Sequence, residues 1–209
     1  MEIADRGLAK GTLTRAVRPR ACALALGATL AMLPGVAPAC GLEDPSSISV
    51  LRGTLQLAYP QALHVGTAVW QAQLEGTLPR DALALRGDLS PEARATLRLV
   101  KANAMLHRLA ARMNHESDRS AHPSLAIVLL GPVLWSRFET TDGVVRPRVH
   151  VAGPEHGDVV VVTDIAVVEA ISEGKLRMTD AIDRGVMRLY GSAAEVTAAH
   201  RWLADGAPR

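Results

Sequence analysis

The residue with the clearest chemistry is Cys40, which stands where an apolar run ends and a polar one begins, in the stretch VAPACGLEDP. A thiol here can carry a thioether-linked lipid, bind a metal, or be the first residue left after a leader is removed. Cys22 is the other cysteine, and it lies in the apolar run, so leader removal would leave Cys40 without an intrachain disulfide partner. A lipid would protect this thiol in an oxidising compartment, and we therefore expect lipidation at Cys40.

Residues 1–39 have the composition of an export signal. A basic stretch precedes the apolar run ACALALGATLAML, a Pro-Gly pair breaks that run, and small residues follow at Ala37 and Ala39. The run is shorter than the roughly 20 apolar residues that span a bilayer. The sequence thus predicts a signal peptide over 1–39 and export to the periplasmic side of the membrane. Ordinary signal peptidase cleavage without a lipid is one alternative, and a retained N-terminal anchor is another.

Charge excludes one class of partner. The chain has 23 Lys+Arg and 21 Asp+Glu, but five of the basic and two of the acidic residues lie in 1–39. The rest of the chain is therefore close to neutral, and no clustered positive field of the kind that binds nucleic acid is evident.

The other candidates for chemistry are weaker. The chain has no G-x-S-x-G elbow, no H-E-x-x-H, no C-x-x-C and no glycine-rich phosphate loop. We therefore name no catalytic residue, no metal ligand and no cofactor, and expect a protein that is not an enzyme. One polar loop contains His115, Glu116, Asp118 and His122, which can meet at a metal, although a hydrated loop is the simpler interpretation. Cys40 with His64 is a second metal alternative, and no sequence spacing fixes that pair.

Residues 40–89, which include Cys40 and His64, are predicted to form an N-terminal helical segment. In SISVLRGTLQLAY, Ile48, Leu51 and Leu55 recur at helical spacing. Pro60 suits the first turn of a second helix, which the glycine of QLEG ends. The residues after it, up to 88, are expected to be a connection.

The clearest element is a helix over 90–114, with Ser90 as its N-cap and Pro91 at its first position. A core helix is the simpler interpretation, and a membrane-surface helix is the alternative because the polar face is basic. The apolar stripe is Leu99, Ala102, Leu106, Leu109 and Met113, widened by Leu97, Val100 and Ala104.

The periodicity changes after the polar loop. Strands are expected over 125–138, with an interruption at Gly131-Pro132, over 146–152 and over 158–163. The unbroken valine run DVVVVT predicts a strand that is covered on both faces.

The last fifty residues are predicted to run helix, helix, strand, helix. Thr163 or Asp164 would cap the first helix, Thr179-Asp180 the second, and Ser192 the last. The strand between them is VMRLYG.

These last elements carry a family resemblance. The segment 163–203 resembles the C-terminal part of the sterol carrier protein type 2-like family, with the step Glu173-Gly174-Lys175-Leu176, a short helix containing Ala181, a glycine-bounded strand GVMRLYG and a closing helix. The resemblance extends over residues 90–205 and leaves the N-terminal helical segment outside it. We accordingly divide the chain into 1–39, 40–89 and a sterol-carrier-like domain over 90–209.

The resemblance implies an α+β fold with a mainly antiparallel five-stranded sheet covered by helices, and an apolar tunnel that binds lipids. It implies no catalytic residues. The positions that it places along the tunnel are Val149, Val151, Val160, Val162, Ile165, Val168, Ile171, Leu176, Ile182, Val186 and Leu189.

The sequence therefore predicts an exported, lipid-anchored, non-catalytic protein that binds a lipid or other apolar small molecule in an internal pocket. One alternative is an interaction or assembly module of the cell envelope, with a filled core and a protein partner. Another is a metal-handling protein that uses Cys40 and histidines.

Overall fold

The computed structural model describes residues 48–116 and 122–205, all of which belong to one unit, Ala37–Arg209. Cys40, the predicted signal peptide and Asp118 of the polar loop lie outside the described residues. No described helix combines the length and the apolar character needed to span a membrane.

The described chain begins with the two helices that were predicted from the N-terminal pattern, α2 (Ile48–Ala58) and α3 (Ala62–Leu74). They are joined by a tight turn in which Gln61 has a φ of 74°. The chain leaves α3 at Gly76, whose φ of 76° favours glycine because a side chain is strained there. Leu55 of α2 and Val65 and Val69 of α3 are buried, and these residues attach the helix pair to the rest of the fold.

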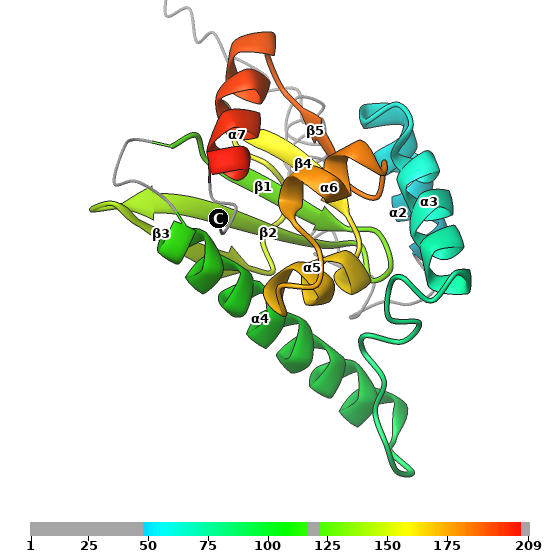
Figure 1. Cartoon of the computed structure of the whole chain (residues 1–209). Coiled ribbons are helices and arrows are strands. Elements are labelled where there is room, and N and C mark those ends of the chain that lie inside the picture. Colours follow the sequence, from blue (N-terminus) through cyan, green and yellow to red (C-terminus); the bar gives the residue numbers. More distant parts are fainter. Residues whose placement is uncertain (1–47, 117–121, 206–209) are drawn as a thin grey trace, which may run out of the picture. The chain divides into compact units, whose positions relative to one another are not determined.

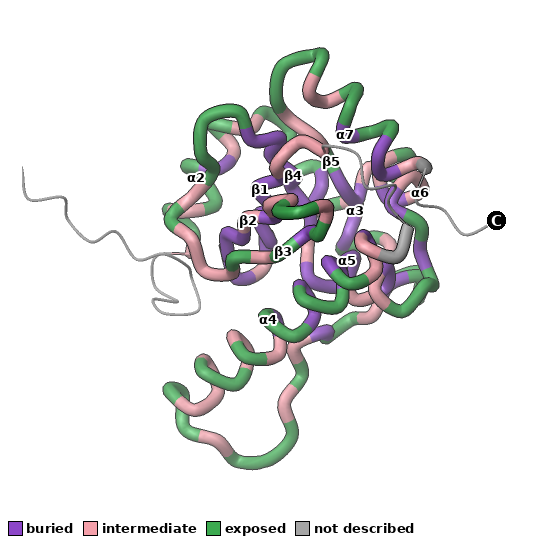
Figure 2. Tube along the Cα trace, turned by 90° about the vertical axis from the view of Figure 1, so that its left-hand side faces the viewer, coloured by how far each residue is buried: buried purple, intermediate pink, exposed green. Residues whose placement is uncertain are grey.

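The long helix α4 (Pro91–Glu116) begins as predicted, with the Ser90 hydroxyl accepting a hydrogen bond of 3.2 Å from the Ala93 N–H. Its later turns bury the expected stripe, but its first turns do not. Leu97 and Val100 are 42% and 58% exposed, and Ala104 is exposed as well, so the prediction that these three residues widen the buried stripe was wrong. Figure 2 shows why: residues 83–101, which include the first turns of α4, contain no buried residue and stand clear of the buried core.

Five strands form one sheet: β1 (Leu125–Leu129), β2 (Leu134–Thr141), β3 (Val144–Val149), β4 (Val159–Thr163) and β5 (Arg188–Tyr190). The strand order is β3-β2-β1-β4-β5. The pairs β1–β2, β2–β3 and β4–β5 are antiparallel, whereas β1 and β4 are parallel. The fold is therefore α+β. The sheet is mixed, because the expected antiparallel arrangement is interrupted by the parallel pair β1–β4.

A parallel pair needs a long crossover, and this chain supplies it with β2, β3 and the turns that follow them. The strand predicted from the valine run is β4, and it lies between β1 and β5. All five residues of β4 are buried, and so are all five residues of β1. Both strands are thus covered on both faces, which explains their unbroken apolar sequences.

Three helices complete the described chain: α5 (Ile165–Ser172) and α6 (Met178–Asp183) follow β4, and α7 (Ala193–Asp205) follows the edge strand β5. Asp164 caps α5, as predicted, and Ser192 caps α7 by accepting from the Glu195 N–H at 3.3 Å. The cap predicted for α6 was wrong, because that helix starts at Met178, with Arg177 at the N-cap and no side-chain bond.

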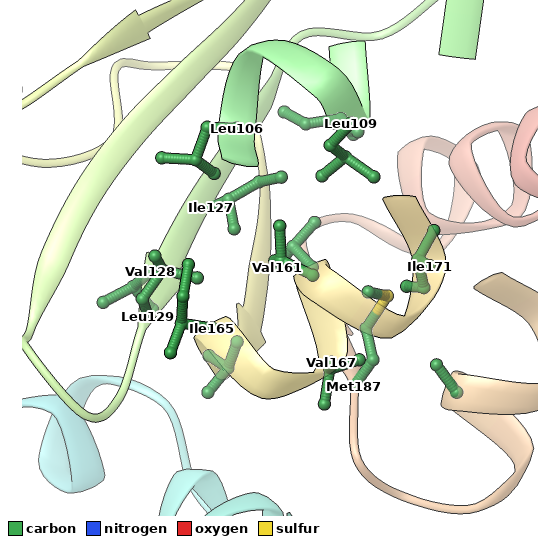
Figure 3. Close-up of a cluster of buried hydrophobic side chains, with 14 of the residues drawn as sticks. Leu106, Leu109, Ile127, Val128, Leu129, Val161, Ile165, Val167, Ile171 and Met187 are labelled. Atoms are coloured by element: carbon green, nitrogen blue, oxygen red, sulfur yellow. The ribbon is translucent and has the colours of Figure 1, made fainter. Parts of the chain in front are cut away.

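Helices cover the two faces of the sheet (Figure 1). On one face, α4 and α5 contribute Leu106, Leu109 and Ile171, which gather with Ile127 and Val161 of the central strands (Figure 3). On the other face, the residue after α2, Tyr59, packs its ring against those of Trp135 and Tyr190, with centroids 6.0 and 5.3 Å apart. The core between sheet and helices is thus filled by aliphatic side chains, with the aromatic cluster under the α2–α3 pair.

Candidate functional site

The site is organised around the turn between β1 and β2, at the interruption Gly131-Pro132. Gly131 lies between a base and an acid from distant parts of the chain. Its carbonyl accepts a hydrogen bond of 2.7 Å from Arg52 Nη2, and its N–H donates one of 2.8 Å to Asp164 Oδ2. Arg52 Nε also donates to the Leu130 carbonyl at 3.0 Å. The turn is thereby fixed to α2 on one side and to the start of α5 on the other.

Backbone strain marks the same turn. Val133, which follows Pro132, has a φ of 48° and is buried. A β-branched residue in the left-handed region is a genuine outlier and persists only where its surroundings impose it. The clamp on Gly131 and the packing of Val133 provide those surroundings.

Asp164 is the titratable group at the centre of the site, and its side chain is partly buried. Burial raises the pKa of its carboxyl, while the hydrogen bonds that it accepts from backbone N–H groups, including those of Ala166 and Gly131, act in the opposite direction. The Arg52 charge lowers the pKa as well. Both oxygens of this carboxyl thus accept hydrogen bonds that hold the turn and the start of α5 in place.

A cavity of about 390 Å3 lies beside the clamped turn. Its walls come from the connection between α3 and α4, the first turns of α4, the turn at Gly131 and the start of α5. Most of the wall is apolar, with Ile48, Leu83 and Ile165 among the residues that line it. The cavity is open to one side and lies where α4 stands clear of the core.

Three arginines also line the cavity, and they differ in how they are engaged. Arg80 donates to the carbonyls of Gln73 and Leu74 at the end of α3, at 3.1 and 3.5 Å. Arg94 makes one long hydrogen bond of 3.4 Å to the Leu89 carbonyl.

Arg98 is the least satisfied of the three. Its Nε atom is buried and has no hydrogen-bond partner among the described residues. An unsatisfied buried donor costs about 1–3 kcal/mol, so this atom is a candidate for contact with a ligand.

A second, larger hollow of about 750 Å3 adjoins the first and shares Gln73, Gly131 and Asp164 with it. Its wall is formed by α3, from which Leu63 and Trp70 contribute exposed apolar side chains. The two hollows meet at the carboxyl of Asp164 and the clamped turn.

The described residues that line the first cavity include no Ser, Cys, His, Lys or Tyr. The titratable side chains that do line it are Asp81, Asp164 and the three arginines. Among the described residues no cluster of three or more His, Cys, Asp or Glu side chains is placed to hold a metal. His122, from the predicted polar loop, stacks on Trp202 with ring centroids 4.4 Å apart.

The predicted tunnel residues lie in the core or at its edge. Ile165 lines the cavity described above, and Val186 lines a separate hollow of about 380 Å3. The buried members are Val160, Val162, Ile165, Val168, Ile171, Leu176 and Val186; the partly buried members are Val149, Val151, Ile182 and Leu189. Their role in ligand binding stays a prediction.

Sequence reasoning missed most of the cavity. The residues after α3 were treated as a plain connection, although Arg80 and Leu83 are part of the wall. The basic residues of α4, which include Arg94 and Arg98, were assigned only to its polar face. One signal was present: the two arginines are one turn apart and begin three residues after Pro91, where the positive end of the helix reinforces their charge.

No protein-family model matches the chain, and no curated protein matches it. Solved structures do. A double mutant of the sec-alkyl sulfatase PisA1 from Pseudomonas sp. is 22% identical over 52% of this chain, with a TM-score of 0.33, but this chain covers only 15% of the sulfatase.

Two further similar structures are much shorter. One, described as possibly a sterol carrier protein, from Thermus thermophilus, is 20% identical, with 50% of this chain and 82% of that chain covered and a TM-score of 0.33. Sterol carrier protein 2 like 2 from Aedes aegypti is 21% identical, with 47% and 93% covered and a TM-score of 0.34. Sterol carrier proteins are thus among the solved structures that this chain resembles.

Proposed function

We propose that this protein binds a lipid or other apolar small molecule without catalysing a reaction, and that it is exported and held at the periplasmic side of the membrane by a lipid on Cys40. The observation that carries the binding role is the cavity of about 390 Å3 with mostly apolar walls. Ligand sites are typically clefts of about 300–1,000 Å3 with apolar walls and a few polar groups.

The energetics of burial favour an apolar guest. Each methylene removed from water contributes about 0.8 kcal/mol before ordering costs. An acyl chain of ordinary length that reaches from this cavity into the adjoining hollow therefore gains enough to bind. We place the guest here because the interior between sheet and helices is occupied by side chains such as Leu106, Val161 and Ile171.

The proposed anchor is compatible with this site. Seven residues separate Cys40 from the start of α2 at Ile48, so the two are eight residue steps apart and at most about 29 Å from each other. Ile48 itself lines the cavity. A lipid on Cys40 would therefore keep the cavity near the bilayer, where apolar molecules are found.

Intact-mass measurement of the protein purified from bacteria that express the full chain tests the anchor. Loss of residues 1–39 together with an added diacylglyceryl mass is expected, and the Cys40→Ser variant should lack that addition. Native mass spectrometry of the same sample tests binding, with a small-molecule adduct that organic solvent removes as the expected result. A chain that keeps residues 1–39, or a folded protein that takes up no apolar molecule, contradicts the corresponding half of the proposal.

A second candidate function, an interaction module of the cell envelope, is favoured by one separate observation. The outer faces of α2 and α3 expose large apolar side chains, with Leu57 at 86%, Trp70 at 61% and Leu74 at 53%. Such exposure on a helix pair is typical of surfaces that contact a partner. Co-purification with one fixed envelope protein, lost in Leu57→Glu and Leu74→Glu, together with no extractable ligand, would favour this function over the first.

A further inference from the structure

The cavity beside the turn at Gly131 is lined by both apolar and basic side chains. A purely apolar ligand does not need the basic ones. Part of the lining is apolar, with Ile48, Leu83 and Ile165. The lining also includes Arg94 and Arg98 from the first turns of α4. Positive side chains are costly beside an apolar surface unless something pairs with them, so this juxtaposition points to the chemistry of the guest.

Arg94 and Arg98 are available for such a partner. Neither forms an ion pair with any described carboxylate. Arg98 has a buried Nε that lacks a hydrogen bond within the described part of the chain, and Arg94 has only the long bond to Leu89. They are four residues apart, so they project from the same side of α4.

The other charged side chains of the wall either bond to the protein itself or limit the negative charge that a ligand can carry. Arg80 is bound to the carbonyl groups at the end of α3, and Asp164 accepts from the N–H groups of Gly131 and Ala166. Asp81 also lines the cavity. Two carboxylates beside the arginines disfavour a polyanion and leave room for a single anionic head.

We propose that the cavity takes an amphiphile with one carboxylate or phosphate head, which Arg94 and Arg98 bind, while the apolar chain lies against Ile48, Leu83 and Ile165. A guanidinium presents paired N–H donors that match both kinds of head. The positive end of α4, which begins at Pro91, reinforces the attraction. This inference rests on the proposed function and narrows its ligand to a chemical class.

The test compares probes that share one chain and differ in the head. Isothermal titration calorimetry measures binding of dodecanoate, dodecyl phosphate, dodecanol and inorganic phosphate to the protein purified from the expressed full chain. Dodecanoate and dodecyl phosphate are expected to bind at least about tenfold more tightly than dodecanol, since hydrogen bonds to charged groups are among the strong ones. Inorganic phosphate is expected to bind more weakly than dodecyl phosphate because it lacks the chain.

The variants are Arg94→Gln and Arg98→Gln, with Arg108→Gln as the matched control. Arg108 is on the same helix, is exposed and does not line the cavity. Each cavity variant should lower the affinity for dodecanoate about tenfold and leave that for dodecanol unchanged. Arg98→Lys keeps the charge and loses the paired donors, so we expect an intermediate loss of affinity for dodecanoate. This variant tests the same contact if Arg98→Gln does not fold.

The outcomes distinguish a failure of this inference from a failure of the proposed function on which it rests. Equal affinity for dodecanol and dodecanoate, or cavity variants that match Arg108→Gln, would overturn recognition of the head while apolar binding stands. Inorganic phosphate that binds as tightly as dodecyl phosphate would overturn the amphiphile in favour of a free anion. Folded protein that binds none of the four probes would overturn both the inference and the proposed function.

Discussion

Arg52 and Asp164, which are far apart in the sequence, hold opposite sides of one peptide turn. Arg52 Nη2 donates to the carbonyl of Gly131 at 2.7 Å, and the Gly131 N–H donates to Asp164 Oδ2 at 2.8 Å. The base belongs to α2 and the acid precedes α5, so the turn joins the N-terminal helix pair to the sheet. Both hollows of the candidate site share Gly131 and Asp164.

This clamp leaves no room for a larger residue at the turn, and Gly131→Ala tests that. A Cβ at Gly131 would lie 3.1 Å from Asp164 Oδ2, so the carboxyl must move and lengthen its hydrogen bonds. We expect a loss of about 1 kcal/mol in the free energy of unfolding, because crowding outweighs the entropy that alanine removes from the unfolded chain. Urea denaturation measures it.

Gly153→Ala is the control for that substitution. A Cβ there meets nothing within 4 Å, and the residue does not have a positive φ. Its stability should equal that of the wild type or exceed it slightly. Equal stability of the two alanine variants would contradict the clamp.

The partly buried carboxyl of Asp164 predicts an unusual pH dependence. Because burial raises its pKa in the folded protein, the folded state binds more protons than the unfolded state between the unfolded pKa of about 3.9 and the higher native value. The contribution of Asp164 to stability therefore falls as the pH rises through that window and is constant above it. Comparison with Asp164→Asn by denaturation at several pH values isolates this contribution.

Asp180→Asn is a control of opposite sign. The hydrogen bonds from Arg177 lower the pKa of Asp180, so its contribution to stability is present above the unfolded pKa and is lost as the pH falls through the native one. If the two variants depart from the wild type in the same direction with pH, the assignment of Asp164 is wrong.

One side chain pairs with the β3 edge of the sheet, and Asn114→Ala removes that side chain. Asn114 of α4 donates to the Val145 carbonyl at 2.9 Å and accepts from the Val145 N–H at 2.6 Å, so its amide acts as a short substitute strand beside β3. We expect a loss of about 1–2 kcal/mol in the free energy of unfolding. Asn103→Ala, at an exposed position of the same helix, should cost nothing. Denaturation midpoints that agree for the two variants would refute this role.

Local patterns predicted the elements well because their causes are local. The valine run of β4, the stripe of α4 and the caps at Ser90 and Ser192 each depend on residues within a few positions of one another. The failures are different in kind. The periodicity of α4 shows which side of the helix faces the core. It does not show that the first turns, with Leu97 and Val100, lie beyond the core, because that depends on where the sheet ends.

The candidate site could not be predicted in the same way. Arg52, Gly131 and Asp164 come together only through the packing of α2 and α5 on the β1–β2 turn. The sequence indicated Asp164 as a helix cap, which it is, but a cap assignment uses only one of its oxygen atoms. Whether an apolar interior keeps a void depends on all its side chains at once, and no single pattern records that sum.

The ion cluster on β2 allows the sharpest test of a buried interaction. Arg137 Nε donates to both oxygens of Asp158, at 2.9 and 3.0 Å, and its Nη1 is 2.7 Å from Glu155. The Asp158 side chain has no exposed surface, so Arg137→Met leaves a buried carboxylate without its counter-charge. Such a loss typically costs about 3–5 kcal/mol. We expect the double variant Arg137→Met, Asp158→Asn to recover most of it, because the neutral amide no longer needs the guanidinium.

A double-mutant cycle by urea denaturation measures this coupling directly. Arg177→Met, which removes the exposed partner of Asp180, is the control and should change stability little, because solvent already screens that pair. The reasoning depends on the burial of Asp158 rather than on the number of its bonds. If the effects of the two single substitutions simply add, Asp158 is solvated in the folded protein and the cluster contributes no more than a surface ion pair.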